Sequence, residues 1–286
     1  MSEIRNTIKL LRFPFSVFLL PISLFSFFYI HPVFNFELFL VLFIWHVLVF
    51  PSSNGYNSYH DNDEGPIGGL AAPPKPTKLL LHISNVMDVA AILLSFIINI
   101  YFVFFVSLYI IASRLYSNRK VRLKKHPLFG FLVVFIFQGA WIFCANVIGL
   151  SSMQLFSLPS VIFSMIASSF LIATIYPITQ IYQHKEDEND GVKTLSMVLG
   201  LKGTFLFSTV MFTVATLLIY LSFYFSNTLE HFWLFIIVML PSTLFFFSWS
   251  IRSFKNEVHI NFKNTMIMLV MSSLLNNIYF FILLIK

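Results

Sequence analysis

Charged residues are scarce in this sequence. They make up 10% of its 286 residues, whereas 58% are hydrophobic. Soluble globular domains carry about 25% charged residues, so the composition excludes that class. Cysteine is almost absent too. The single cysteine, Cys144, excludes an intramolecular disulfide and a metal site built on several cysteines, and we interpret it as a packing residue.

The sequence has long runs without Asp, Glu, Lys or Arg. They cover residues 13–36, 38–60, 126–184, 203–229, 231–251 and 264–285. A bilayer core about 30 Å thick needs roughly 20 apolar residues per helix. The run 126–184 is therefore long enough for two helices, and residues 79–113 supply two more, with breaks near Ile100 and near 149–152. We predict an all-α, polytopic membrane protein with nine transmembrane helices, forming a single domain over residues 1–286.

The basic residues predict the orientation of these helices. With the N-terminus in the cytoplasm, 17 of the 18 Lys and Arg residues fall in cytoplasmic segments, and only Lys286 does not. Such an excess is typical of the cytoplasmic loops of membrane proteins. We therefore expect the N-terminus and the long loops on the cytoplasmic face of a bacterial inner membrane. This topology accounts for the net charge of +6 without a nucleic-acid partner.

The few acids are concentrated in two segments. Residues 57–65 and 183–191 hold seven of the twelve Asp and Glu residues, and both segments are expected on the same face. Asn57 and Asp61 are four residues apart, as are Gln183 and Asp187, a spacing that puts each pair on one face of a helix. Mg²⁺ prefers such oxygen ligands, usually one or two carboxylates together with phosphate oxygens. The pattern predicts a magnesium site for a diphosphate, and the alternative is that these loops are simply solvated.

A basic segment, residues 113–125, lies between the two acidic segments along the chain. Its cations are candidates for pairing with phosphate oxygens. The alternative is that they only anchor a cytoplasmic loop at the membrane surface.

Taken together, these segments resemble the UbiA superfamily of intramembrane prenyltransferases. The pattern Asn57-x-x-x-Asp61 is similar to the first aspartate-rich motif of that family, with Gly65 four residues further on. Residues 183–200, which begin Gln183-x-x-x-Asp187, are similar to the second. The order, spacing and common face of the motifs cover essentially the whole chain.

Two further features support the resemblance, and two depart from it. Tyr116-Ser is similar to the start of the basic signature of the family, and Arg12-Phe-Pro resembles the start of its first helix. The first motif usually reads Asn-Asp, whereas Ser58 follows Asn57 here. The second usually begins with Asp, whereas this chain has Gln183. Neighbouring acids are available as replacements; they are Asp63, Glu64, Glu186, Glu188 and Asp190.

The resemblance implies Mg²⁺-dependent transfer of an isoprenyl group from an isoprenyl diphosphate to a lipophilic acceptor, most often an aromatic ring or a hydroxyl. The implied catalytic residues are Asn57, Asp61 and Asp187. The implied metal ligands are Asp61, Asp63, Glu64, Gln183 and Asp187. The implied diphosphate-binding residues are Asn57, Tyr116, Arg122, Lys124, Gln183 and Lys193. The Phe-rich helices would enclose the tail, in contact with membrane lipid and without an obligate protein partner.

Asp88 is the one acid inside a predicted span. Ionisable residues within a membrane are costly, and they are functional candidates by default. With Asn85 one turn earlier, Asp88 is a further catalytic candidate that would face the chamber and orient or deprotonate the acceptor. The alternative is a structural pair with Asn146 or Asn277.

Two other functions fit the same sequence. A transporter or lipid carrier would use the acidic loops to gate a cation, but such proteins concentrate polar residues at the membrane midplane. A family member that binds an isoprenoid without turnover is the other alternative, because Ser58 and Gln183 replace expected carboxylates.

Overall fold

The computed structural model describes residues 2–285; helices joined by loops make up this range, and it contains no β-strand. Nine helical segments in this range are long and apolar enough to cross a membrane. They are Glu3–Ile30, Phe36–Asp61, Lys78–Ile98, Ile100–Ser117, Pro127–Leu150, Pro159–Gln180, Leu195–Phe225, Leu229–Lys255 and Phe262–Ile285. The predicted all-α polytopic fold is confirmed, with breaks at Asn99 and between Leu150 and Pro159.

Three of the spans are built from shorter helices. The first comprises α1 (Ser2–Leu11), α2 (Phe13–Ser16), a 3₁₀ turn and α3 (Leu20–Ile30). In the second span, a π-helical stretch separates α4 (Phe36–Phe43) from α5 (Phe50–Asp61). In the fifth span, another π-helical stretch separates α8 (Pro127–Phe135) from α9 (Trp141–Leu150). Such turns occur in helices at functional sites. The remaining helices are α6 (Lys78–Ile98), α7 (Ile100–Ser117), α10 (Pro159–Ile175), α11 (His184–Asn189), α12 (Leu195–Phe225), α13 (Leu229–Lys255) and α14 (Phe262–Ile285).

Asparagine residues mark several helix ends. Asn99 separates α6 from α7, because its extended backbone interrupts the helix and its side chain accepts a hydrogen bond from the Phe102 amide (2.8 Å). Asn62 ends α5 in the left-handed conformation, with φ of 54°. Asn tolerates this conformation better than most residues. As a result, Asp61 lies in the last turn of α5, at the end of the second span.

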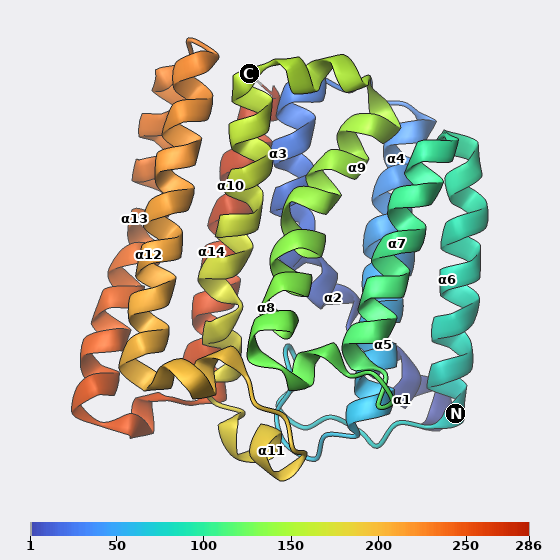
Figure 1. Ribbon diagram of the computed structural model, residues 1–286, viewed down its shortest axis with the longest axis vertical. Helices are drawn as coiled ribbons and strands as arrows, with labels where there is room; N and C mark the ends of the chain where they lie inside the picture. Colours follow the sequence, from blue (N-terminus) through green and yellow to red (C-terminus); the bar gives the residue numbers. More distant parts are fainter. Residues whose placement is uncertain (1, 286) are drawn as a thin grey trace.

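Figure 1 shows how the spans are arranged. Helices α12 and α13 lie on one side of the molecule, α6 and α7 lie on the other, and α1 and α11 lie at the lower end. We call this end the loop face; it is formed by residues 62–77, 118–126 and 181–194. The C-terminus lies at the opposite end.

Buried side chains from distant parts of the chain hold the spans together. The Trp45 indole donates a hydrogen bond to Asn146 Oδ1 (3.1 Å), and the Asn146 amide donates to Ser26 Oγ (3.1 Å). This network joins the second span to α9 and α3. Helix α12 is kinked at Gly200, where φ is 66° and ψ is 176°, a conformation available mainly to glycine.

Candidate functional site

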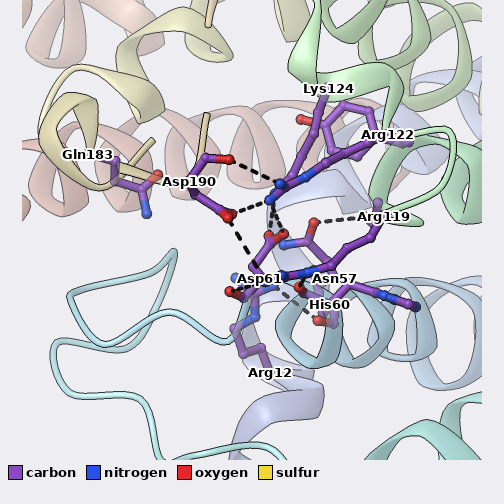
Figure 2. Close-up of polar contacts among 12 residues, drawn as sticks. Arg12, Asn57, His60, Asp61, Arg119, Arg122, Lys124, Gln183 and Asp190 are labelled. Atoms are coloured by element: carbon purple, nitrogen blue, oxygen red, sulfur yellow. Dashed lines mark hydrogen bonds and ion pairs between the residues drawn. The ribbon is translucent and has the colours of Figure 1, made fainter. Parts of the chain in front are cut away.

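Asp61 is the centre of a charged network at the loop face (Figure 2). Its side chain is only 4% exposed, and it forms ion pairs with Lys124 and, at 3.5 Å, with Arg122. Both cations come from the basic segment that follows α7. A buried carboxylate is costly unless it is paired, and these two ion pairs compensate for the burial of the Asp61 side chain at the end of α5.

Arg122 also joins the first acidic segment to the second. It forms an ion pair with the Asp190 carboxylate and donates a hydrogen bond to the Asp190 carbonyl oxygen (3.2 Å). Arg119 lies 3.9 Å from the same carboxylate and donates to the His60 carbonyl oxygen (2.6 Å). The basic segment therefore bridges the ends of α5 and α11 (Figure 2).

Amide and hydroxyl groups complete these connections. Asn57 Oδ1 accepts a hydrogen bond from Ser117 Oγ (2.8 Å), and the Gln183 amide donates to the Pro66 carbonyl oxygen (2.9 Å). The Tyr116 and Tyr176 hydroxyls are hydrogen-bonded at 3.1 Å. Gln183 thus connects the start of the second acidic segment directly to the loop that follows the first.

The carboxylates at the loop face are close enough to repel one another. Burial, followed by the charge of Asp61, raises the pKa of Asp63 to about 6. Burial raises the pKa of Asp187 to about 7; the charge of Lys124 opposes this shift, whereas Asp61, Asp63 and Glu186 add to it. A cation bound among these groups would relieve the repulsion.

The ligand set suits Mg²⁺ bound together with a phosphate. Within residues 2–285, no three His, Cys, Asp or Glu side chains are arranged to hold a metal by themselves. Mg²⁺ is usually held by one or two carboxylates plus substrate phosphate oxygens, so it does not need three. Asp61 and Asp187 provide such carboxylates, and Asn57 and Gln183 provide neutral amide groups beside them.

A cavity of about 870 Å³ opens beside this cluster. At the loop face it is lined by Asp61, Asp187 and Lys124, together with Asn57, Asp63, Tyr116, Gln183 and Glu186. Further into the membrane-spanning part, aromatic residues such as Phe50 and Phe137 line it. One end of the cavity is therefore charged and the other largely apolar, which suits a molecule with an anionic head and a hydrocarbon tail.

Three of the predicted site residues do not line this cavity. Glu64 has an 83% exposed side chain and lies 3.9 Å from Lys75, because it follows the turn that ends α5. Lys193 is exposed, and its backbone amide contacts the Lys125 carbonyl oxygen (3.3 Å). Arg122 forms ion pairs with Asp61 and Asp190, and its side chain lies outside the cavity lining. The prediction that these three residues contact metal or diphosphate is corrected accordingly.

Asp88 does not line the cavity either. It forms an ion pair with Arg114 of α7 and accepts a hydrogen bond from Ser52 of α5. The Arg114 guanidinium also lies 3.8 Å from the centre of the Tyr56 ring. Asp88 therefore connects three helices, and the expectation that it faces the chamber is corrected.

The alternative partners expected for Asp88 are also wrong. Asn146 is hydrogen-bonded to Trp45 and Ser26, and Asn277 donates to the Val17 carbonyl oxygen (3.3 Å). Whether Arg114, the one charged residue of α7, faces α6 depends on how these helices pack, which the sequence does not reveal.

The role of Arg12 was not predicted. Its side chain lines the cavity and donates hydrogen bonds to the carbonyl oxygens of Gly68 (3.1 Å) and Asn54 (3.4 Å). Its backbone is left-handed, with φ of 50°, an uncommon conformation for arginine. The position of Arg12 beside Phe13-Pro14, at the start of the first span, was the available signal. Tyr176 and Gln180 also line the cavity, but no sequence pattern indicated them.

Comparison with known proteins shows similarity over nearly the whole chain. A family model described as the UbiA prenyltransferase family matches residues 18–275. No curated protein matches the sequence.

Solved structures share the fold at low sequence identity. A UbiA homologue from Archaeoglobus fulgidus bound to DMAPP and Mg²⁺ has a TM-score of 0.70 and 16% identity, with 98% of this chain and 99% of that chain covered. A UbiA homologue from Aeropyrum pernix K1 has a TM-score of 0.69 and 14% identity, with 95% and 98% covered. A digeranylgeranylglyceryl phosphate synthase has a TM-score of 0.64 and 16% identity, with 100% and 98% covered.

Proposed function

The chain belongs to the UbiA prenyltransferase family, and from this premise we propose that it transfers an isoprenyl group from an isoprenyl diphosphate to a lipophilic acceptor, with Mg²⁺ as cofactor. One observation carries the proposal. Two acidic segments from separate helices and the cation Lys124 meet at the charged end of a cavity whose other end is largely apolar.

The residues at the charged end have complementary roles. Asp61 and Asp187 would hold Mg²⁺, supported by Asp63 and the amides of Asn57 and Gln183. When bound, Mg²⁺ neutralises the charge that develops on the departing diphosphate. Lys124 and Arg12 also line this end and supply positive charge to phosphate oxygens. Arg122 acts indirectly, by holding Asp61 and Asp190 in place.

The apolar part of the cavity has the second role. It takes up the isoprenyl tail and excludes water from the reacting carbon. In the reaction, the bond between the first isoprenyl carbon and the diphosphate oxygen breaks, and both electrons leave with diphosphate. A carbon or oxygen of the acceptor then bonds to the same isoprenyl carbon, and the acceptor loses a proton to solvent.

The orientation in the membrane is part of the proposal. The chain is an integral, multi-pass membrane protein, and we assign the loop face to the cytoplasm of a bacterial inner membrane because the cations gather there. A water-soluble diphosphate would then enter from the cytoplasm, and the lipophilic acceptor from the membrane.

The test uses the purified full-length protein in lipid nanodiscs. Radiolabelled isoprenyl diphosphates of several chain lengths are supplied with a lipid extract of the host, with Mg²⁺ or with EDTA. We expect Mg²⁺-dependent release of diphosphate and label in the lipid fraction. Binding without release in every condition would favour an isoprenoid-binding protein, and no binding at all would contradict the proposal.

Variants at the two motifs make the test specific. Asp61→Asn and Asp187→Asn should each lower turnover by at least about 100-fold, the scale seen when a group that stabilises transition-state charge is removed. Glu257→Gln, an exposed acid between α13 and α14, is the matched control and should retain activity. Near-normal turnover in either motif variant would show that the metal is held elsewhere.

A further inference from the structure

The wall formed by α12, α13 and α14 differs from the rest of the cavity. Among apolar residues such as Phe212 and Met239, hydroxyl-bearing side chains line it well inside the membrane-spanning part; they include Thr209, Thr213, Thr216, Ser242, Thr243 and Ser272. The wall formed by α3, α8 and α10 is instead lined mainly by aliphatic residues such as Ile22, Val134 and Ile172, with Thr174 as its one hydroxyl-bearing residue. The proposed diphosphate site at the loop face makes no use of this polar wall.

The hydroxyl hydrogens of the polar wall are already engaged. Each of the six hydroxyl groups donates to a carbonyl oxygen of its own helix, over 2.8–3.1 Å. For example, Thr213 donates to the Thr209 carbonyl oxygen (2.9 Å), and Thr243 donates to that of Met239 (3.0 Å). A hydroxyl oxygen that has donated its hydrogen can still accept hydrogen bonds. The wall therefore offers mainly acceptors to whatever fills the cavity.

Two buried atoms on this wall have no partner within the described part of the chain. Ser208 Oγ is buried and unpaired, and the Ser208 residue is 0% exposed. Asn276 Oδ1 is also buried and unpaired, although the Asn276 amide nitrogen donates to the Ser272 carbonyl oxygen (2.8 Å). Both residues line the cavity. Buried polar atoms without partners are rare, and a bound ligand is one way to satisfy them.

An isoprenyl tail cannot satisfy this wall, because a hydrocarbon has no hydrogen-bond donor. Packing a tail against Ser208 and Asn276 would leave their buried oxygens without a hydrogen-bond partner, at a free-energy cost for each. The aliphatic wall suits the tail without that cost. The two walls thus suit two different ligands in one cavity.

We propose that the α12–α13–α14 wall is the subsite for the acceptor substrate, and that this acceptor is a lipophilic molecule with at least two hydroxyl or amine hydrogen-bond donors. This inference rests on the proposed function, because it assumes that donor and acceptor share the cavity. It narrows the acceptor from any lipophilic molecule to one whose polar groups donate hydrogen bonds toward the membrane interior.

The experiment compares two probes with the same ring and alkyl tail, hexylresorcinol and its dimethyl ether, in which methyl groups replace both hydroxyl hydrogens. Their affinities are measured in nanodiscs without diphosphate or Mg²⁺, with lipid partitioning subtracted by means of empty nanodiscs. We expect the diol to bind about tenfold tighter than the ether, roughly the factor for two neutral hydrogen bonds. Equal affinities would overturn the proposal and would indicate that water molecules form the hydrogen bonds with the polar atoms of this wall.

Variants locate the preference on the wall. Ser208→Ala combined with Asn276→Leu should lower diol affinity to that of the ether while leaving ether affinity unchanged. Ser248→Ala makes the same chemical change at an exposed position of α13 outside the cavity lining, and should leave both affinities unchanged. A preference that persists in the double variant would overturn the assignment. If the double variant does not fold, Ser208→Ala alone and Thr213→Val alone should each lower diol affinity about threefold, because each removes one of the two hydrogen bonds.

Failure of this proposal and failure of the enzymatic proposal are separable. The binding comparison requires no turnover, so a diol preference in a protein that never releases diphosphate would support the wall as a binding site for hydrogen-bond donors and contradict catalysis. Conversely, Mg²⁺-dependent diphosphate release together with equal probe affinities would contradict only the subsite.

Discussion

Single residues at the loop face are held in arrangements that no short motif describes. Asp61 is paired with Lys124 and Arg122, whereas Asp187 is near other carboxylates and has a raised pKa of about 7. The two aspartates of the similar motifs are therefore in different electrostatic states. One is neutralised by cations of the chain itself, and the other is destabilised as an anion.

This difference predicts how stability depends on pH. The pKa values of Asp63 and Asp187 are raised to about 6 and about 7 from an ordinary 3.8, so ionisation costs the folded protein free energy. Their contribution to stability is fully present below the ordinary pKa and is lost as the pH rises through 6 to 7. These two carboxylates should therefore lower the thermal denaturation midpoint of the metal-free protein at about pH 8 relative to about pH 5. The pKa of His184, which burial lowers, acts in the opposite direction, so the carboxylate effect is measured as the difference from a variant without it.

Two comparisons assign this pH effect to the carboxylates. Asp187→Asn should reduce the pH dependence in EDTA, because the asparagine side chain does not ionise and only the contribution of Asp63 remains, whereas Glu257→Gln should leave the pH dependence unchanged. Mg²⁺ with inorganic diphosphate should raise the midpoint most at the higher pH. An Asp187→Asn protein with the full pH dependence would show that other groups cause it.

The sequence predicted the residue types of the site better than their contacts. Asn57, Asp61 and Asp187 were identified from amide–carboxylate spacing, and all three line the cavity. Arg122 was predicted to bind diphosphate, yet its guanidinium forms ion pairs with Asp61 and Asp190. Glu64 was predicted to bind the metal, yet its side chain is exposed. Residue spacing specifies the face of a helix, but the partner depends on loops whose path no local pattern determines.

At the scale of helices, the pair Asp88 and Arg114 joins α6 to α7, and Ser52 adds α5. Helix α5 carries Asn57 and Asp61. The Asp88–Arg114 ion pair therefore helps to position these site residues through its contacts with α5. Arg114 also stacks on Tyr56 of α5. The partner of Asp88 was not predictable from the sequence. Helices that face lipid and helices that face other helices have similarly apolar sequences, so the sequence does not show which helices are neighbours.

Removing one member of this buried pair should destabilise the fold. Arg114→Leu leaves the Asp88 carboxylate buried without its cation, and such changes cost about 3–5 kcal/mol. The double variant Asp88→Leu with Arg114→Leu should recover most of that loss, because no unpaired charge remains. Thermal denaturation in detergent measures both, with Arg252→Leu, an exposed cation of α13, as control.

Turnover of the neutral variant Asp88→Asn separates a structural role from a catalytic one. We expect turnover per folded molecule within about threefold of the unmodified protein, since the asparagine can still bond Ser52 and lies outside the cavity lining. A loss of several orders of magnitude in a folded Asp88→Asn protein would instead place Asp88 in the chemistry.

At the scale of the whole molecule, hydropathy alone predicted nine spans, because bilayer thickness sets the length of every apolar run. The kink at Gly200 and the acceptor-rich wall of α12, α13 and α14 were not predicted. Ser and Thr are common in membrane helices, and only the packed structure shows which of them face a cavity. The odd number of spans also puts the loop face and the C-terminal end of the last helix on opposite sides.

The orientation of the whole molecule can be measured with an impermeant maleimide in intact cells. Cys144→Ser first removes the single native cysteine. Single cysteines are then introduced by Glu64→Cys, at the loop face, and by Met153→Cys, in the exposed turn between α9 and α10. Because the loop face carries the cations, we expect it to be cytoplasmic, so only the Met153→Cys protein should be labelled before the cells are lysed. Labelling of the Glu64→Cys protein alone would invert the topology and place the proposed diphosphate site outside the cell, where the proposed reaction has no donor.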